Sequence, residues 1–196
     1  PEPSRPLAPS RPSDDHPSVI SPLGDDDGQR FKHGLLINRL LQSLPYLATG
    51  ERQAQGRAYL SRPIHDLIPG EQEEILAETL GVLTHPDHAG LFGPESLAEV
   101  QITGIVAGKD SIHVLAAQLD RLLVTEEAVS VIDFKTNRPP PKTEAQVDPR
   151  YLRQMAAYRN ALREIYPDRP VRAVLLWTLG PRLTTLREAI LDDSER

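Results

Sequence analysis

The spacing of the hydrophobic residues changes about halfway along the chain. In the first part, leucines recur at helical intervals, as at Leu36, Leu40 and Leu44, and this spacing is typical of a helix with one buried face. It predicts three helices, over residues 31–44, 52–60 and 71–83. From residue 97 onward the apolar residues form short runs separated by turns, which favours strands over residues 97–104, 112–124 and 128–136.

The three expected strands follow one another closely, so their simplest arrangement is an antiparallel meander. Asp148 and Pro149 mark the start of a further helix that runs to residue 166, because proline is favoured at the first helical position. Residues 171–178 are almost entirely apolar, which predicts a central strand, and the segment after Arg182 is expected to add another. This order predicts an α/β fold, with a mixed sheet flanked by helices and an N-terminal helical part.

The N-terminal stretch shows no such periodicity. Seven prolines lie among serines and arginines between Pro1 and Pro22, a composition typical of an extended or flexible linker. We therefore expect a linker over residues 1–28 and one domain over residues 29–196. Because the chain begins with proline rather than methionine, we expect it to be a piece of a longer polypeptide.

Composition excludes several kinds of site. The chain has no cysteine, which rules out disulfides, thiolate metal sites and a cysteine nucleophile. No apolar run has transmembrane length and no signal peptide is visible, so we expect a cytoplasmic protein without a membrane partner.

The net charge of −6 is unevenly distributed along the chain. Residues 133–187 contain 11 Lys and Arg against 5 Asp and Glu, an excess of +6, so the remainder carries −12. A basic half suits a polyanionic substrate such as nucleic acid, although an uneven solvated surface is by itself the commoner explanation.

Two apolar runs each end by presenting a carboxylate. Asp120 follows one of them and Asp133 follows the other, with Lys135 two residues further on. Because side chains alternate along a strand, Asp133 and Lys135 point to the same face, and Asp120 reaches that face if the two runs pair. Two carboxylates suffice to hold Mg²⁺, and an ammonium beside them can stabilise charge that develops on a phosphate. A single D-x-K match, however, is more often an ion pair at a strand end.

The helix after this region adds a second feature. Gln154 and Tyr158 lie four residues apart on it and share one face, next to the basic Arg153. Other candidates fail: His85 and His88 stand in a proline-bearing loop without further obvious ligands. The glycine-rich run at 104–110 lacks the Ser or Thr that follows the lysine of a phosphate-binding loop, so this chain is not expected to hydrolyse ATP.

These features resemble the PD-(D/E)xK nuclease superfamily, specifically its RecB-like branch. Asp120 matches the family's first metal carboxylate, the Asp-Phe-Lys-Thr run at 133–136 matches its core motif, and the pair at 154 and 158 matches its Q-x-x-x-Y motif. The resemblance covers roughly residues 29–177, and Glu99 stands where the family often has an acidic residue.

The resemblance implies a restriction-endonuclease-like core and a role for each matching residue. It implies Mg²⁺, or Mn²⁺, bound by Asp120, Asp133 and the backbone carbonyl of Phe134. Lys135 would act on the attacked phosphate or its water, and Gln154 would support the site. The residues expected to contact DNA are Tyr158, Arg153 and Arg138.

Residues 137–141 and 151–158 look most like the C-terminal nuclease domain of AddA-type helicase–nucleases. This implies an exonuclease domain that cuts single-stranded DNA fed to it by helicase domains of the same parent chain. It also implies an AddB-type partner subunit, a role in processing double-strand ends for recombinational repair, and a bacterial, nucleoid-associated location in the cytoplasm.

One position departs from the family pattern. The first helix of the RecB-like branch usually carries a metal-binding histidine, and Asn38 stands at that position here. An Asn side chain offers a carbonyl oxygen, which Mg²⁺ accepts, but its reach is shorter. His33 lies five residues away and points elsewhere on the helix. The alternative is therefore a catalytically weakened or inactive module on a nuclease fold, used for DNA binding or subunit docking.

Overall fold

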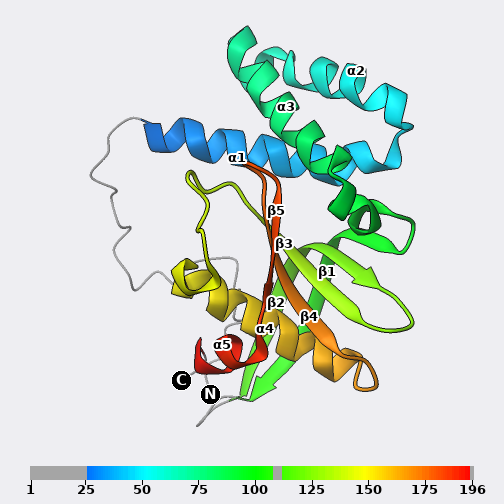
Figure 1. Ribbon diagram of the computed structural model, residues 1–196, viewed down its shortest axis with the longest axis vertical. Coiled ribbons are helices and arrows are strands. Elements are labelled where there is room, and N and C mark those ends of the chain that lie inside the picture. The colour runs from blue at the N-terminus through cyan, green and yellow to red at the C-terminus, as the bar shows by residue number, and fades with distance from the viewer. Residues whose placement is uncertain (1–25, 108–111, 195–196) are drawn as a thin grey trace, which may run out of the picture.

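The computed structural model describes residues 26–107 and 112–194, and Figure 1 shows how its elements are arranged. Five strands form one sheet in the order β1-β2-β3-β4-β5. β3 and β4 run parallel, and the other neighbouring pairs are antiparallel, so the predicted mixed sheet is confirmed. The strands are β1 (Ser96–Ala107), β2 (Ile112–Val124), β3 (Val129–Lys135), β4 (Val171–Trp177) and β5 (Arg182–Leu186).

Within the described residues, five α-helices flank the sheet. They are α1 (Asp26–Ser43), α2 (Thr49–Leu60), α3 (Pro69–Thr84), α4 (Pro149–Ile165) and α5 (Glu188–Ser194). In Figure 1, α1, α2 and α3 gather at one end of the molecule, while α4 and α5 lie together near the other.

The start of α4 shows how the sequence sets a helix boundary. Pro149 is its first residue, and the Asp148 carboxylate accepts the backbone N–H of Arg150 at 2.8 Å. Proline has no N–H to leave unsatisfied in the first turn, and the aspartate satisfies one that would otherwise lack a partner. The predicted start of this helix is therefore confirmed.

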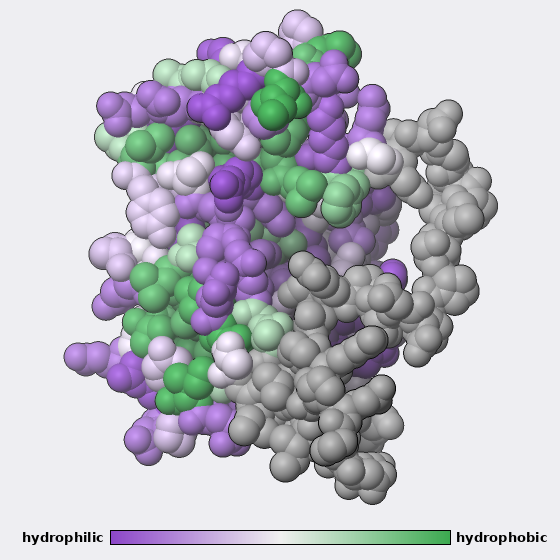
Figure 2. Space-filling model, turned by 180° about the vertical axis from the view of Figure 1, so that it is seen from behind, coloured by the Kyte–Doolittle hydropathy of each residue, from purple (hydrophilic) through white to green (hydrophobic). Residues whose placement is uncertain are grey.

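The sheet is covered on both faces. Val129 and Val131 of β3 pack in one apolar cluster with the buried residues of α4, whereas Ile132 and Phe134 pack in a second cluster with those of α1 and α3. A strand covered on both sides needs apolar residues at almost every position, and this explains why Ser130 is the only polar residue between Ala128 and Asp133. On the face seen in Figure 2, hydrophobic residues form separate groups among hydrophilic ones.

The boundaries differ from expectation in a few places. α1 begins at Asp26, inside the stretch of residues 1–28 expected to be a linker. The short helix α5 was not predicted, because seven residues are too few to show helical periodicity. The proline-rich stretch before residue 26 and the turn expected at 108–110 lie outside the described residues. Among the helices of the described part, none combines the length and the apolar character needed to cross a membrane.

Candidate active site

Three carboxylates lie in one row across strands β1, β2 and β3. In the β1–β2 register Ala98 pairs with Arg121 and Val100 with Leu119, so Glu99, between them, lies opposite Asp120. The β2–β3 register, continued by one residue, places Asp133 on the other side of Asp120. Neighbouring strands are about 4.8 Å apart, so the sheet itself brings these acidic residues together.

Asp120 lies between the other two carboxylates, and its pKa is strongly raised. Its Oδ2 accepts the backbone N–H of Phe134 at 2.8 Å. Burial, then the neighbouring charge of Asp133 and to a smaller extent that of Glu99, raise the pKa of Asp120 to about 7, although the Phe134 N–H and Lys135 oppose the rise. The Asp120 carboxyl group therefore keeps its proton to a higher pH than an exposed aspartate does, because Lys135 does not offset the burial and the neighbouring negative charge.

The Lys135 ammonium contacts three side chains, those of Asp133, Gln154 and Tyr151. Its Nζ is 2.6 Å from Asp133 Oδ2, a charge contact that lacks the angles of a hydrogen bond. The same ammonium donates to Gln154 Oε1 at 3.0 Å and lies 3.9 Å from the ring centroid of Tyr151. These contacts hold the ammonium beside the carboxylates, because each restricts a flexible side chain.

Gln154 is in turn held by Tyr158. Gln154 Nε2 donates to the Tyr158 hydroxyl at 2.8 Å, so the amide can present only its oxygen to Lys135. The Tyr158 side chain is fully buried, and its ring has no surface with which to contact DNA. We therefore revise the expectation of a DNA contact at Tyr158: this tyrosine positions Gln154.

This revision predicts the behaviour of Tyr158→Phe. Removing the hydroxyl leaves Gln154 Nε2 without its acceptor and frees the amide to rotate, so cleavage of DNA should fall about tenfold, a cost of about 1.4 kcal/mol. DNA affinity measured without metal should stay unchanged. Tyr166→Phe, the same change at the residue that follows α4, is the control. If Tyr158→Phe binds DNA more weakly and Tyr166→Phe does not, the original expectation that Tyr158 contacts DNA is correct.

Glu99 is held beside Asp120 by two side-chain amides. Gln42 of α1 donates to one of its carboxylate oxygens and Gln118 of β2 donates to the other. Its backbone has a φ of 56°, a left-handed conformation that residues other than glycine rarely adopt. The fold thus accepts an unusual backbone conformation at the residue opposite Asp120.

One face of α1 passes over this row of carboxylates. Gly34, Asn38 and Gln42 are spaced four residues apart and so share that face. At one end, a Cβ built on Gly34 would lie 2.8 Å from Thr136 Oγ1, and at the other end Gln42 contacts Glu99. Asn38 therefore lies between the end of β3 and Glu99, and its buried Oδ1 has no hydrogen-bond partner among the described residues.

The donor atoms in this region are oxygens, the type of ligand that a hard divalent cation prefers. In the part of the chain that the structure describes, no group of three or more His, Cys, Asp or Glu is placed to hold one ion. The donors present are instead two neighbouring carboxylates, Asp120 and Asp133, and the unpartnered oxygen of Asn38. Oxygen donors, with water completing the shell, are what Mg²⁺ prefers. A cation would offset the burial and the charge of Asp133, which together raise the pKa of Asp120.

The two arginines expected to contact DNA differ in their surroundings. Arg153 is exposed on α4 and forms no ion pair among the described residues. Arg138 is ion-paired with Glu78 of α3, which also accepts from Thr178 Oγ1. Arg138 thus ties the segment after Lys135 to α3, whereas Arg153 remains available to a phosphate.

Sequence reasoning missed several contacts of this site. Tyr151 lies three residues before Gln154, on the same face of α4, and that spacing could have revealed it. Gln42 follows Asn38 by one helical turn, so the same rule applies. Gln118 reaches Glu99 only through the pairing of β1 with β2, which the sequence alone does not fix.

Comparisons with known proteins identify what this arrangement is similar to. A family model described as "PD-(D/E)XK nuclease superfamily" matches residues 29–194. One matching solved structure, described as the crystal structure of SSO0001, is 12% identical with a TM-score of 0.37, over 82% of this chain and 81% of that chain. A similarity this low says nothing about function. No curated protein matches the chain.

Proposed function

The chain belongs to the PD-(D/E)XK nuclease superfamily, and we propose that it is a divalent-metal-dependent DNA nuclease domain. One observation carries the proposal: the side chains of Asp120, Asp133 and Lys135 meet at one point of the sheet. Lys135 Nζ lies 2.6 Å from Asp133 Oδ2, and Asp120 accepts the N–H of the residue between them.

Four groups would hold the metal. Asp120 and Asp133 would supply carboxylate oxygens and Phe134 its backbone carbonyl, while the side-chain oxygen of Asn38 would be a further ligand. When bound, the ion would neutralise charge on the phosphate and lower the pKa of a water molecule.

Lys135 would act on the phosphate itself. Its ammonium is already held between Asp133 and Gln154, so little reorganisation is needed when negative charge develops on the phosphate oxygens. Gln154 and Tyr158 would act through Lys135, as positioning residues. Arg153 would bind the DNA backbone outside the reacting centre.

Cleavage of labelled single-stranded DNA with Mg²⁺ or Mn²⁺ tests the proposal. The wild-type protein should cleave, and Asp133→Asn should be slower by about a hundredfold or more because it removes a metal-binding charge. Asp168→Asn, which changes an exposed aspartate after α4, should cleave like the wild type. Equal cleavage rates for all three proteins would contradict the assignment of Asp133 to a nuclease active site.

We further propose that the domain is an exonuclease from an AddA-type helicase–nuclease, in the bacterial cytoplasm, working with an AddB-type subunit on double-strand ends. The support is the motif order at 120, 133–136 and 154–158 and the basic stretch that follows Asp133. An exonuclease should degrade linear single-stranded DNA and spare a circular strand of the same sequence. Equal degradation of both would contradict this.

A second candidate function is a non-catalytic module for DNA binding or subunit docking. Asn38 favours it, because it replaces the histidine of the RecB-like branch, and no three-ligand acidic or histidine cluster occurs among the described residues. In that case the protein would bind DNA but show no Mg²⁺ or Mn²⁺ site by calorimetry.

Replacing Asn38 distinguishes the two candidates further. Asn38→His restores an imidazole, whose longer reach should raise Mn²⁺ affinity about tenfold if the surrounding donors are correctly placed. Calorimetry with Mn²⁺ measures this, and Asn38→Ala should weaken binding. Unchanged affinity in both variants would show that position 38 does not face the metal.

A further inference from the structure

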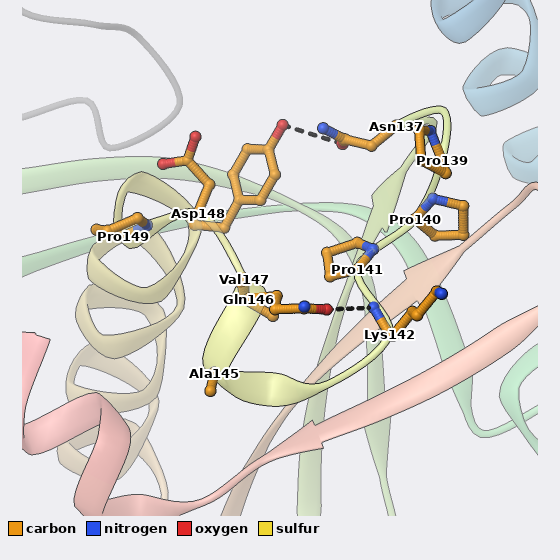
Figure 3. Close-up of a pocket in the computed structure, with 11 residues that line it drawn as sticks. Asn137, Pro139, Pro140, Pro141, Lys142, Ala145, Gln146, Val147, Asp148 and Pro149 are labelled. Atoms are coloured by element: carbon orange, nitrogen blue, oxygen red, sulfur yellow. Dashed lines mark hydrogen bonds between the residues drawn. The ribbon is translucent and has the colours of Figure 1, made fainter.

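A groove of about 700 Å³ opens beside Lys135. It is formed by the segment from Asn137 to Tyr151, and Figure 3 shows residues 137–142 along one side and residues 145–149 along the other. This volume lies in the usual range of small-ligand sites. Tyr151 belongs both to the groove and to the contacts of Lys135, so the groove directly adjoins the candidate active site.

The walls of the groove are mostly flat and apolar. Pro139, Pro140 and Pro141 contribute consecutive rings, and Tyr151 contributes an aromatic ring. Proline rings and aromatic rings both offer rigid surfaces, which lose little entropy when a ligand stacks on them.

Hydrogen bonds within the protein fix the shape of the groove. The Tyr151 hydroxyl donates to Asn137 Oδ1 at 3.1 Å, and the backbone N–H of Lys142 donates to Gln146 Oε1 at 3.0 Å. From β5, Arg182 donates to the backbone carbonyls of Pro141 and Lys142. These bonds restrict the segment that forms the groove, so less conformational entropy is lost when a ligand binds.

The charge around the groove suits a polyanion. Residues 135–153 contain five Lys and Arg against two Asp and Glu, and both acidic residues are already ion-paired: Glu144 with Arg187, and Asp148 with Arg150. Lys142 and Arg153 form no ion pair within the described part of the chain. Apolar rings flanked by free cations match a nucleotide, whose base stacks while its phosphate is bound.

We propose that this groove binds one unpaired nucleobase of a single strand, next to the phosphate that Lys135 would contact. The inference rests on the proposed nuclease function and adds a reason for strand selectivity. A base inside a duplex is paired and stacked and could not enter the groove, so single-stranded DNA is the substrate class that fits.

Binding of oligonucleotides that carry one 2-aminopurine, moved along the strand, tests the groove without cleavage when metal is chelated. At one position the fluorescence should be quenched by stacking. Removing the base at that position should weaken wild-type binding about tenfold. Tyr151→Leu should bind the intact strand about tenfold more weakly and be insensitive to the missing base, because the two changes remove the same interaction.

Tyr151→Phe keeps the ring and should retain the quenching, and Tyr166→Leu is the control at a distant tyrosine. Uniform fluorescence along a bound strand, or equal affinity with and without each base, overturns the proposal even if Tyr151→Leu fails to fold, since both use the wild-type protein. Position-specific quenching without cleavage would support base binding in the groove and contradict the proposed nuclease activity. Cleavage with uniform fluorescence would support the nuclease activity and contradict base binding in the groove.

Discussion

Replacing Lys135 with methionine should reduce DNA cleavage about a hundred- to a thousandfold and leave divalent-metal binding intact. The loss is expected because removing one preorganised donor to a developing oxyanion typically costs that much. Metal binding is expected to survive because the substitution removes a positive charge that lies 2.6 Å from Asp133 Oδ2. That charge competes with a cation for the same oxygen, so affinity for Mn²⁺ should stay the same or rise.

Comparison with Asp133→Asn separates a role in metal binding from a role in cleavage. The aspartate variant should lose both metal binding and cleavage, whereas Lys135→Met should lose only cleavage. Lys32→Met in α1 is the control, because the Lys32 ammonium donates to the backbone carbonyl of Asp66. Calorimetry with Mn²⁺ and single-turnover cleavage measure the two properties separately. If Lys135→Met loses the metal as well, Lys135 is structural and not catalytic.

The local part of this site follows from the sequence. Strand alternation alone predicts that Asp133 and Lys135 share a face, and their charged atoms lie 2.6 Å apart. Helical spacing alone predicts that Gln154 and Tyr158 are neighbours, and the two side chains are hydrogen-bonded. Both results depend only on the periodicity of one element, so no knowledge of the tertiary fold was needed.

The remaining part depends on contacts between distant segments. The burial of Tyr158 could not be foreseen, because a hydroxyl four residues from a glutamine is equally compatible with an exposed helix edge. Predicting the position of Glu99 requires the register between β1 and β2. That register is set by which face of each strand is buried and by the geometry of the connecting turn. The meander was expected, but the residue opposite Asp120 was not, and neither was the glutamine that reaches Glu99 from α1.

In the absence of metal, Asp120→Asn should stabilise the protein at pH 8 and have little effect near pH 4. The pKa of Asp120 is raised to about 7, first by burial and then by Asp133. At low pH both folded and unfolded chains hold the proton and no penalty arises. As the pH rises from about 4 to about 7, the unfolded chain loses this proton before the folded chain does, so wild-type stability falls.

Asparagine carries no charge, and its side-chain oxygen can still accept the Phe134 N–H. The variant should therefore escape this loss, and the difference from wild type should grow between pH 4 and pH 8 to about 2–4 kcal/mol. Denaturant unfolding in a chelator measures it, with the exposed Asp168→Asn as the control. A pH-independent difference would mean that Asp120 is not held protonated by its surroundings.

Adding Mg²⁺ at pH 8 should reverse the order of stability. The ion binds ionised carboxylates and only in the folded state, so it should stabilise the wild-type protein in proportion to its binding. It should do little for Asp120→Asn, which lacks the charge. The instability of the metal-free site and its affinity for a cation would then share their causes, the burial of the Asp120 carboxylate and its repulsion from Asp133. If Mg²⁺ stabilises both proteins equally, the ion binds elsewhere and these carboxylates are not its site.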